Sequence, residues 1–102
     1  MAKTYKIQIS ARAEKDFKSI QRYTLKTHGE KQVWIYTGML KEGLRKLSEN
    51  PKLYGHTRSD IPQIYRSYKI AEHSLIYRIE ADTVYLVAIL HGSMDFPSQL
   101  KT

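Results

Sequence analysis

Apolar and polar residues alternate at the start of the chain and then take up a helical period. Residues 5–9 (Tyr-Lys-Ile-Gln-Ile) have the period of two that is typical of a half-buried strand. Ser10 is then expected to cap a helix, because its hydroxyl can accept a hydrogen bond from a first-turn amide. Glu14 and Asp16 suit the positive end of that helix's dipole, and His28-Gly29 is expected to end it. The apolar stripe of this helix is Ala13, Phe17, Ile20 and Thr24.

A second helix is predicted to begin at once. Trp34 and Tyr36 widen its apolar face, and Asn50-Pro51 ends it because the residue before a proline disfavours helical dihedral angles. Gly38 and Gly43 each cost a helix about 1 kcal/mol relative to Ala. We expect these glycines to allow close approach of the first helix in an antiparallel hairpin; the alternative is a plain, slightly weak helix. The repeating apolar positions are Val33, Thr37, Leu40, Leu44 and Leu47.

The period of two returns after an irregular stretch over residues 51–62. It predicts three further strands that are joined by short turns. The strands span residues 64–70, 73–79 and 83–91, and the turns span residues 71–72 and 80–82. The last strand is apolar on both faces, which favours a central position in the sheet. The N-terminal strand is the candidate to flank it.

The order of these elements predicts an α+β fold with two layers. An N-terminal strand and an antiparallel two-helix hairpin precede a three-stranded antiparallel meander, and the helices pack on one face of the sheet. The chain has 102 residues, within the usual domain size of about 100–150, so we expect residues 1–102 to form a single domain. The second face of the sheet would lack cover from this chain, and the tail over residues 94–102 would be short and mobile. A bare sheet face favours the docking of a partner.

Composition narrows the classes of function. The chain has no cysteine, which excludes a disulfide framework, a thiolate zinc site and a thiol nucleophile. It carries 17 Lys and Arg against 10 Asp and Glu, and the whole excess of +7 lies in residues 1–60. A field of this sign attracts nucleic acid, an anionic membrane or an acidic protein. The longest apolar run, residues 84–90, is far shorter than the ~20 residues of a membrane helix, so we expect a soluble, cytoplasmic protein without a membrane partner.

Tight hairpin turns would place six polar and aromatic side chains on one face of the sheet. The expected cross-strand pairs are Arg66 with Tyr77, Tyr68 with Leu75, and His73 with Ile89. The shared face would then carry Arg66, Tyr68, His73, Tyr77, Tyr85 and His91. Arginine can bind a phosphate and tyrosine can stack on a base, so this set could hold RNA. Tyrosine and histidine are equally ordinary on half-buried strands, where the polar tip reaches the rim.

The same face could cleave RNA by in-line attack of a 2′-hydroxyl. That reaction needs a base, an acid for the leaving 5′-oxygen and a cation for the charge of the phosphorane. His73 or His91 could serve as acid or base, and Arg58 or Arg66 as the cation. The four histidines of the chain lack paired spacing and clustered carboxylates, so we expect no metal site and no cofactor.

A series of short motifs runs through nearly the whole chain in a recognisable order. They are Ile9-Ser10-Ala11, Tyr23-Thr24, His28-Gly29, Tyr36, Leu47-Ser48-Glu49-Asn50-Pro51, Arg58-Ser59-Asp60-Ile61, Tyr65-Arg66, His73-Ser74-Leu75-Ile76-Tyr77-Arg78 and Ile89-Leu90-His91-Gly92-Ser93-Met94-Asp95. With the order of elements, they resemble the ParE branch of the RelE/ParE toxins of bacterial type II toxin–antitoxin pairs. The resemblance extends from residue 5 to about residue 96.

This resemblance implies a toxin that inhibits DNA gyrase and so blocks replication. A ParE-like toxin would act by binding, so no catalytic residue is expected, and nucleic acid would be contacted only indirectly, through gyrase or the antitoxin. RelE-like relatives instead cut mRNA in the ribosome, which is the alternative. Under it, the catalytic residues would be Arg58, Arg66, His73 and His91.

Several positions depart from the nuclease pattern of the RelE-like branch. Arg66 falls where that branch has a sheet arginine, but after Arg78 the only Lys or Arg is Lys101. Met94-Asp95 stand where basic residues would be expected, and an Asp there would repel a phosphate. His91 could compensate, because some relatives use a late histidine.

The resemblance also implies a ParD-like antitoxin as a partner. Its acidic, disordered tail would wrap the basic helical hairpin and add to the uncovered sheet face or edge, folding as it binds. A third possibility is an interaction module that only binds its partner. The residues expected to contact partners are Trp34, Tyr36, Arg58, Arg66, His91, Met94 and Asp95.

Overall fold

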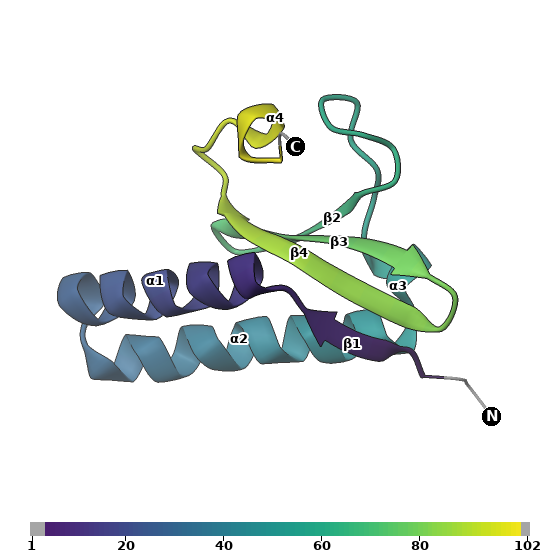
Figure 1. Cartoon of the computed structure of the whole chain (residues 1–102). Helices are drawn as coiled ribbons and strands as arrows, with labels where there is room; N and C mark the ends of the chain where they lie inside the picture. Colours follow the sequence, from purple (N-terminus) through teal and green to yellow (C-terminus); the bar gives the residue numbers. More distant parts are fainter. Residues whose placement is uncertain (1–3, 101–102) are drawn as a thin grey trace.

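The computed structural model describes residues 4–100 and has the predicted two-layer α+β architecture (Figure 1). Its elements are β1 (Lys6–Ile9), α1 (Ala11–His28), α2 (Glu30–Glu49), α3 (Pro51–Tyr54), β2 (Arg66–Ile70), β3 (His73–Glu80), β4 (Thr83–His91) and α4 (Phe96–Gln99). The sheet has the order β1-β4-β3-β2, with β1 parallel to β4 and the other pairs antiparallel. The central place of β4 beside β1 is therefore confirmed. The short helices α3 and α4 were not expected.

Both ends of α1 form as the sequence indicates. The Ser10 hydroxyl accepts a hydrogen bond from the Ala13 amide at 2.9 Å and donates one to the Val87 carbonyl at 2.8 Å. Ser10 therefore starts the helix and also holds it to β4. Gly29 ends the helix with a φ of 91°, a left-handed value that glycine adopts without a side-chain clash.

The main core lies between the helical hairpin and the sheet. Ala13, Leu40 and Leu47 from the helices pack with sheet residues that include Tyr77 and Leu86, all nearly or fully buried. The prediction for the two glycines of α2 was wrong. A Cβ at Gly43 would lie 2.0 Å from Ile70 Cδ1, whereas one at Gly38 would meet nothing within 4 Å. The close approach is therefore between α2 and the sheet, and it involves one glycine only.

The second face of the sheet is partly covered by this chain, contrary to the prediction. A separate apolar cluster consists of Ile61, Ile76, Ala88, Leu90 and Phe96, with Tyr65 and Leu100 packed against it. Figure 1 shows α4 and the loop after α3 on the side of the sheet opposite to α1 and α2. The tail is therefore anchored as far as residue 100, because Phe96 is buried. Residues 101 and 102 of the predicted tail lie outside the described residues.

A tighter turn and an extra residue in β4 change the predicted pairing. Glu80 pairs with Thr83, so the turn is residues 81–82 instead of 80–82, which moves the register by one residue. A further shift at Ile76/Tyr77 leaves Val87 without a partner, so His73 pairs with His91 instead of Ile89. The pairs of Arg66 with Tyr77 and of Tyr68 with Leu75 are confirmed.

These two changes of register split the predicted polar face. Leu86 and Ile89 both join the core under the helices, which places His91 on that side, whereas Tyr85 lies on the other face. There the Arg78 guanidinium is 4.2 Å from the centre of the Tyr85 ring. The six side chains therefore do not share one face.

No helix among residues 4–100 combines the length and the apolar character that a membrane crossing requires.

Candidate functional site

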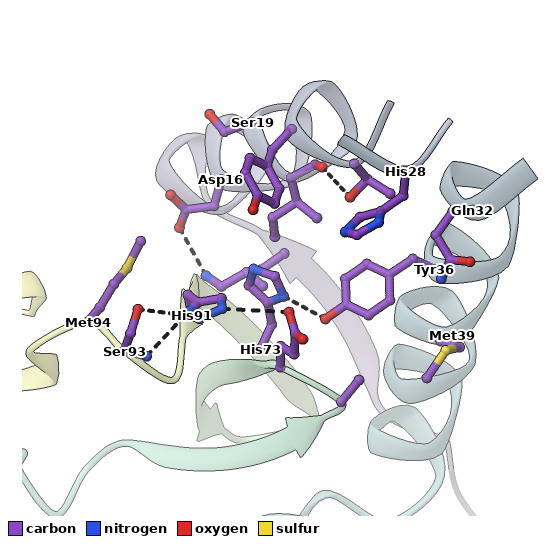
Figure 2. Close-up of a pocket in the computed structure, with 16 residues that line it drawn as sticks. Asp16, Ser19, His28, Gln32, Tyr36, Met39, His73, His91, Ser93 and Met94 are labelled. Carbon is purple, nitrogen blue, oxygen red and sulfur yellow. Dashed lines mark hydrogen bonds and ion pairs between the residues drawn. The ribbon is translucent and has the colours of Figure 1, made fainter. Parts of the chain in front are cut away.

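A groove of about 670 Å³ opens between the helical hairpin, the turn from β2 to β3 and the end of β4 (Figure 2). Helices α1 and α2 contribute residues such as Asp16, Tyr23, His28 and Tyr36. The turn and the strand ends contribute Glu72, His73, His91, Ser93 and Met94. Tyr36, His73, His91 and Glu72 face one another here from α2, β3, β4 and the turn from β2 to β3, so this groove is the candidate functional site.

His73 is held at the back of the groove by Tyr36. Tyr36 Oη lies 2.5 Å from His73 Nδ1 and also donates to the Ile70 carbonyl at 3.2 Å. The His73 and His91 rings meet edge to face at a centroid distance of 5.1 Å. Because Tyr36 comes from α2 and His73 begins β3, this contact ties the helical hairpin to the end of the sheet.

Burial keeps the side chains of Tyr36 and His73 uncharged at neutral pH. It lowers the pKa of His73, and the charge of a protonated His91 would lower it further, while Glu72 and Asp16 oppose the change. Burial raises the pKa of Tyr36, with a smaller contribution from Glu72. At neutral pH the pair is therefore joined by a hydrogen bond between two uncharged side chains.

The orientation of His91 is fixed by the turn that follows β4. The Ser93 amide donates to His91 Nδ1 at 3.0 Å, and the Ser93 hydroxyl lies 2.7 Å from the same atom. Nδ1 is thus an acceptor, so the neutral ring carries its proton on Nε2. That nitrogen lies 3.7 Å from a carboxylate oxygen of Glu72.

The groove contains candidate acids and bases without a cation. No Lys or Arg is found among the described residues that line it, whereas two carboxylates are, Asp16 and Glu72. Asp16 accepts hydrogen bonds from the Ile89 amide at 2.9 Å and from Arg12 Nε at 3.0 Å. The negative charge that develops on a phosphorane would therefore find no positive side chain in the groove.

The two arginines that could have supplied this cation are engaged elsewhere. Arg66 donates to the Lys52 carbonyl at 2.9 Å and to the Gly55 carbonyl at 2.7 Å. It begins β2, about 13 Å along the strand from the residue that pairs with His73. Arg58 forms an ion pair with Asp60 at 2.7 Å and stacks on the ring of Phe96. Of the four residues named for cleavage, the structure brings together His73 and His91 only.

The residues expected to contact partners are also divided. Tyr36, His91 and Met94 line the groove. Trp34 projects from α2 with 76% of its surface exposed. Asp95 is exposed before α4, while Arg58 and Arg66 bind their own neighbours as described above.

Sequence reasoning missed Asp16, Glu72 and Ser93 as groove residues. Asp16 was interpreted only as a partner of the helix dipole, and its contact with Ile89 joins positions 73 residues apart, so no local pattern reveals it. Within residues 4–100, no group of three His, Cys, Asp or Glu side chains is placed to hold a metal ion.

Lowering the pH below 6.5 is expected to reduce the free energy of unfolding, because His73 becomes protonated. Its folded pKa lies below the ordinary value of about 6.5, so the unfolded chain binds its proton first. The neutral His73 therefore makes its full contribution to the free energy of unfolding above pH 6.5, and this contribution is lost as the pH falls toward the folded pKa. Urea unfolding at pH 7.5 and at lower pH should show a loss of stability that is smaller in His73→Gln. Identical losses in the two proteins would contradict this assignment.

Comparison with solved structures identifies the class of fold. The chain matches the chromosomal ParDE toxin–antitoxin system from P. aeruginosa with a TM-score of 0.75 and 13% identity, over 86% of this chain and 96% of the other. It matches the RelBE2 toxin–antitoxin complex from Mycobacterium tuberculosis with a TM-score of 0.66 and 17% identity, over 89% and 94% of the two chains. For the DinJ-YafQ complex of E. coli the TM-score is 0.57 at 20% identity, over 97% and 99%. The fold is that of the RelE/ParE-type toxins of type II toxin–antitoxin systems.

Sequence comparison identifies the family within that class. The family model described as the ParE toxin of the type II toxin–antitoxin system parDE matches residues 7–96. Toxin ParE of Escherichia coli is 28% identical over 96 residues, which is 90% of this chain and 89% of the relative. The chain therefore belongs to the ParE toxin family, and the resemblance noted in its motifs is confirmed.

Proposed function

We propose that this ParE-family toxin inhibits DNA gyrase in the cytoplasm by binding it, and that a ParD-like antitoxin neutralises it. The observation that carries the proposal is the groove with three histidines (His28, His73 and His91), two carboxylates and no Lys or Arg among its described residues. An enzyme that cuts a phosphodiester needs a cation at the phosphate. Membership of the ParE family supports the choice of gyrase as the target.

The arginines on and beside the sheet support the same choice. Arg58 and Arg78 form ion pairs with Asp60 and Glu80, and Arg66 is held by two backbone carbonyls. A cation that is held by a carboxylate or by backbone carbonyls is not free to turn toward a transition state. Inhibition by occupying a surface requires none of these groups to be free.

The antitoxin partner is supported by the exposed apolar side chains of α2. Trp34, Ile35 and Met39 are 76%, 48% and 41% exposed. An acidic tail that folds on binding needs apolar anchors of this kind, and the basic charge of the toxin would speed its capture. The related structures of RelBE2 and DinJ-YafQ are toxin–antitoxin complexes.

One comparison tests the proposed function. Purified toxin is expected to stop supercoiling by purified gyrase and to leave mRNA on translating ribosomes intact. The antitoxin encoded beside it should restore supercoiling in the same assay. As a control, His73→Gln should inhibit gyrase as well as the unchanged protein does, provided that it folds. Cleaved transcripts with supercoiling untouched would overturn the proposal in favour of the mRNA endonuclease.

A further inference from the structure

A row of four cations follows the outward side of α1. Lys15, Lys18, Arg22 and Lys26 are spaced by three, four and four residues, and all four are exposed. This spacing keeps them on one face, and the rise of an α-helix makes the row about 16 Å long. Ala13 and Thr24, which are buried, mark the opposite face of the helix. We call these four residues the α1 row.

The α1 row lines up four cations that have no ion pair or side-chain hydrogen bond, whereas the other described lysines in that state, Lys31, Lys41, Lys52 and Lys69, are scattered over α2, α3 and β2. Among residues 4–100, Arg12, Arg45, Arg58 and Arg78 all form ion pairs with carboxylates. No residue of the α1 row forms an ion pair or a side-chain hydrogen bond within that part of the chain. The paired arrangement is clearest on α2, where Arg45 binds both Glu42 and Glu49.

The acidic residues of α1 do not neutralise the row. Only Glu14 and Asp16 are available on this helix. Asp16 is directed into the groove, where it binds Arg12 and the Ile89 amide (Figure 2). Glu14 stands at the N-terminal end of the row, so the length of helix from Lys15 to Lys26 faces solvent with positive charge only.

The surroundings of the row favour a phosphate backbone over a folding peptide. Ser19 lies between the cations, and Leu25 and Tyr23 are the large exposed apolar side chains of α1, of which Tyr23 lines the groove. The exposed apolar side chains that could anchor a peptide gather instead on α2, at Trp34, Ile35 and Met39. A disordered acidic peptide needs such anchors to offset the conformational entropy that it loses on binding. A nucleic-acid backbone needs only cations in a line.

We propose that the α1 row is a sequence-independent binding surface for the phosphate backbone of duplex DNA. This contact is direct, unlike the contact through gyrase or the antitoxin that the sequence suggested, and it does not depend on the proposed function. Duplex DNA carries a charge for about every 1.7 Å of its axis, so a row of this length meets several phosphates. On a toxin that acts at gyrase, the surface would hold the chain to DNA near its target.

The salt dependence of binding gives the proposal a quantitative form. Four phosphate contacts predict that the logarithm of the association constant falls with the logarithm of salt concentration with a slope of about −3.6. Affinity should then fall by about 150-fold between 50 and 200 mM salt. Fluorescence anisotropy of a labelled 30-base-pair duplex with the full-length protein measures both quantities.

Two variants that remove the same charge separate the row from net charge. The row variant is Lys15→Gln/Lys18→Gln/Arg22→Gln/Lys26→Gln, and the control is Lys31→Gln/Lys41→Gln/Lys52→Gln/Lys69→Gln. The eight positions are all exposed, so both proteins should fold, which circular dichroism checks. At 100 mM salt the row variant should bind DNA at least about 30-fold more weakly, and the control should stay within about threefold of the unchanged protein.

Three outcomes would overturn this proposal. The first is an equal loss in both variants, which would assign binding to net charge. The second is a slope near zero or no binding at 50 mM salt. The third is equal displacement of the duplex by polyglutamate of matched charge, which would assign the row to an acidic polypeptide. Since gyrase is absent from this experiment, its failure would leave the proposed function standing.

Discussion

A single methyl group added at Gly55 is expected to lower the free energy of unfolding by about 3 kcal/mol. A Cβ at this position would lie 1.9 Å from Tyr77 Oη and 2.7 and 2.8 Å from two ring carbons. Tyr77 has no room to move away, because it is fully buried and its hydroxyl donates to the Pro51 carbonyl at 2.5 Å. Urea unfolding of Gly55→Ala measures the loss.

Gly38→Ala is the matched control for this substitution. A Cβ at Gly38 meets nothing within 4 Å, so the change should stabilise α2 by about 1 kcal/mol through helix propensity. Adding Tyr77→Phe to Gly55→Ala removes the nearest clashing atom, so the double variant should lose less stability than the two single variants combined. If Gly55→Ala and Gly38→Ala have equal free energies of unfolding, the segment around Gly55 can move away from Tyr77, and the prediction is wrong.

The corner around α3 explains why the sheet does not present a phosphate site. Tyr77 binds the Pro51 carbonyl, and Arg66 binds the carbonyls of Lys52 and Gly55. These bonds satisfy backbone groups that the short helix leaves without partners, which is a structural use of a tyrosine and an arginine. The sequence indicated only an irregular stretch here, so both side chains seemed free to bind a ligand.

Local periodicity was enough to predict most of the architecture. The strand over residues 83–91 has the predicted bounds, and Ser10 and Gly29 limit α1 as expected. These features depend on neighbours in the chain, since a capping hydroxyl or a left-handed glycine acts within a few residues. The central place of β4 also follows from its own residues, because a strand that is apolar on both faces needs cover on both.

Features that depend on distant contacts could not be predicted. The two-residue turn pairs Tyr77 with Leu86 and so moves Tyr85 away from the predicted face, while the unpaired Val87 returns His91 to the side of Tyr77, and nothing in the sequence marks either feature. Phe96 and Ile61 cover the second face of the sheet from two separate segments, which no periodicity joins. The groove itself forms from α1, α2, a turn and the end of β4, so its composition emerges only with the tertiary fold.

Asp16→Ala is expected to lower the free energy of unfolding by about 3 kcal/mol, because it leaves the buried Ile89 amide without its acceptor and removes the ion pair of Arg12. The Asp16 carboxylate is only 16% exposed and accepts from Arg12 and from the amide of Ile89, which is itself buried. Unfolding in guanidinium chloride measures the loss of free energy. Faster hydrogen exchange of the Ile89 amide would show that the loss arises at this contact.

Asp16→Asn distinguishes a structural carboxylate from one that serves a ligand in the groove. The amide oxygen can still accept from the Ile89 amide, so this variant should keep most of the stability while losing the ion pair with Arg12. Arg12 also holds the C-terminal helix, donating to the Gln99 side chain at 2.8 Å, so Arg12→Ala should loosen α4 and spare the Ile89 amide. If Asp16→Asn abolishes gyrase inhibition while the fold remains stable, the charge of Asp16 acts on a partner. Retained inhibition would mean that Asp16 stabilises the groove and takes no part in binding.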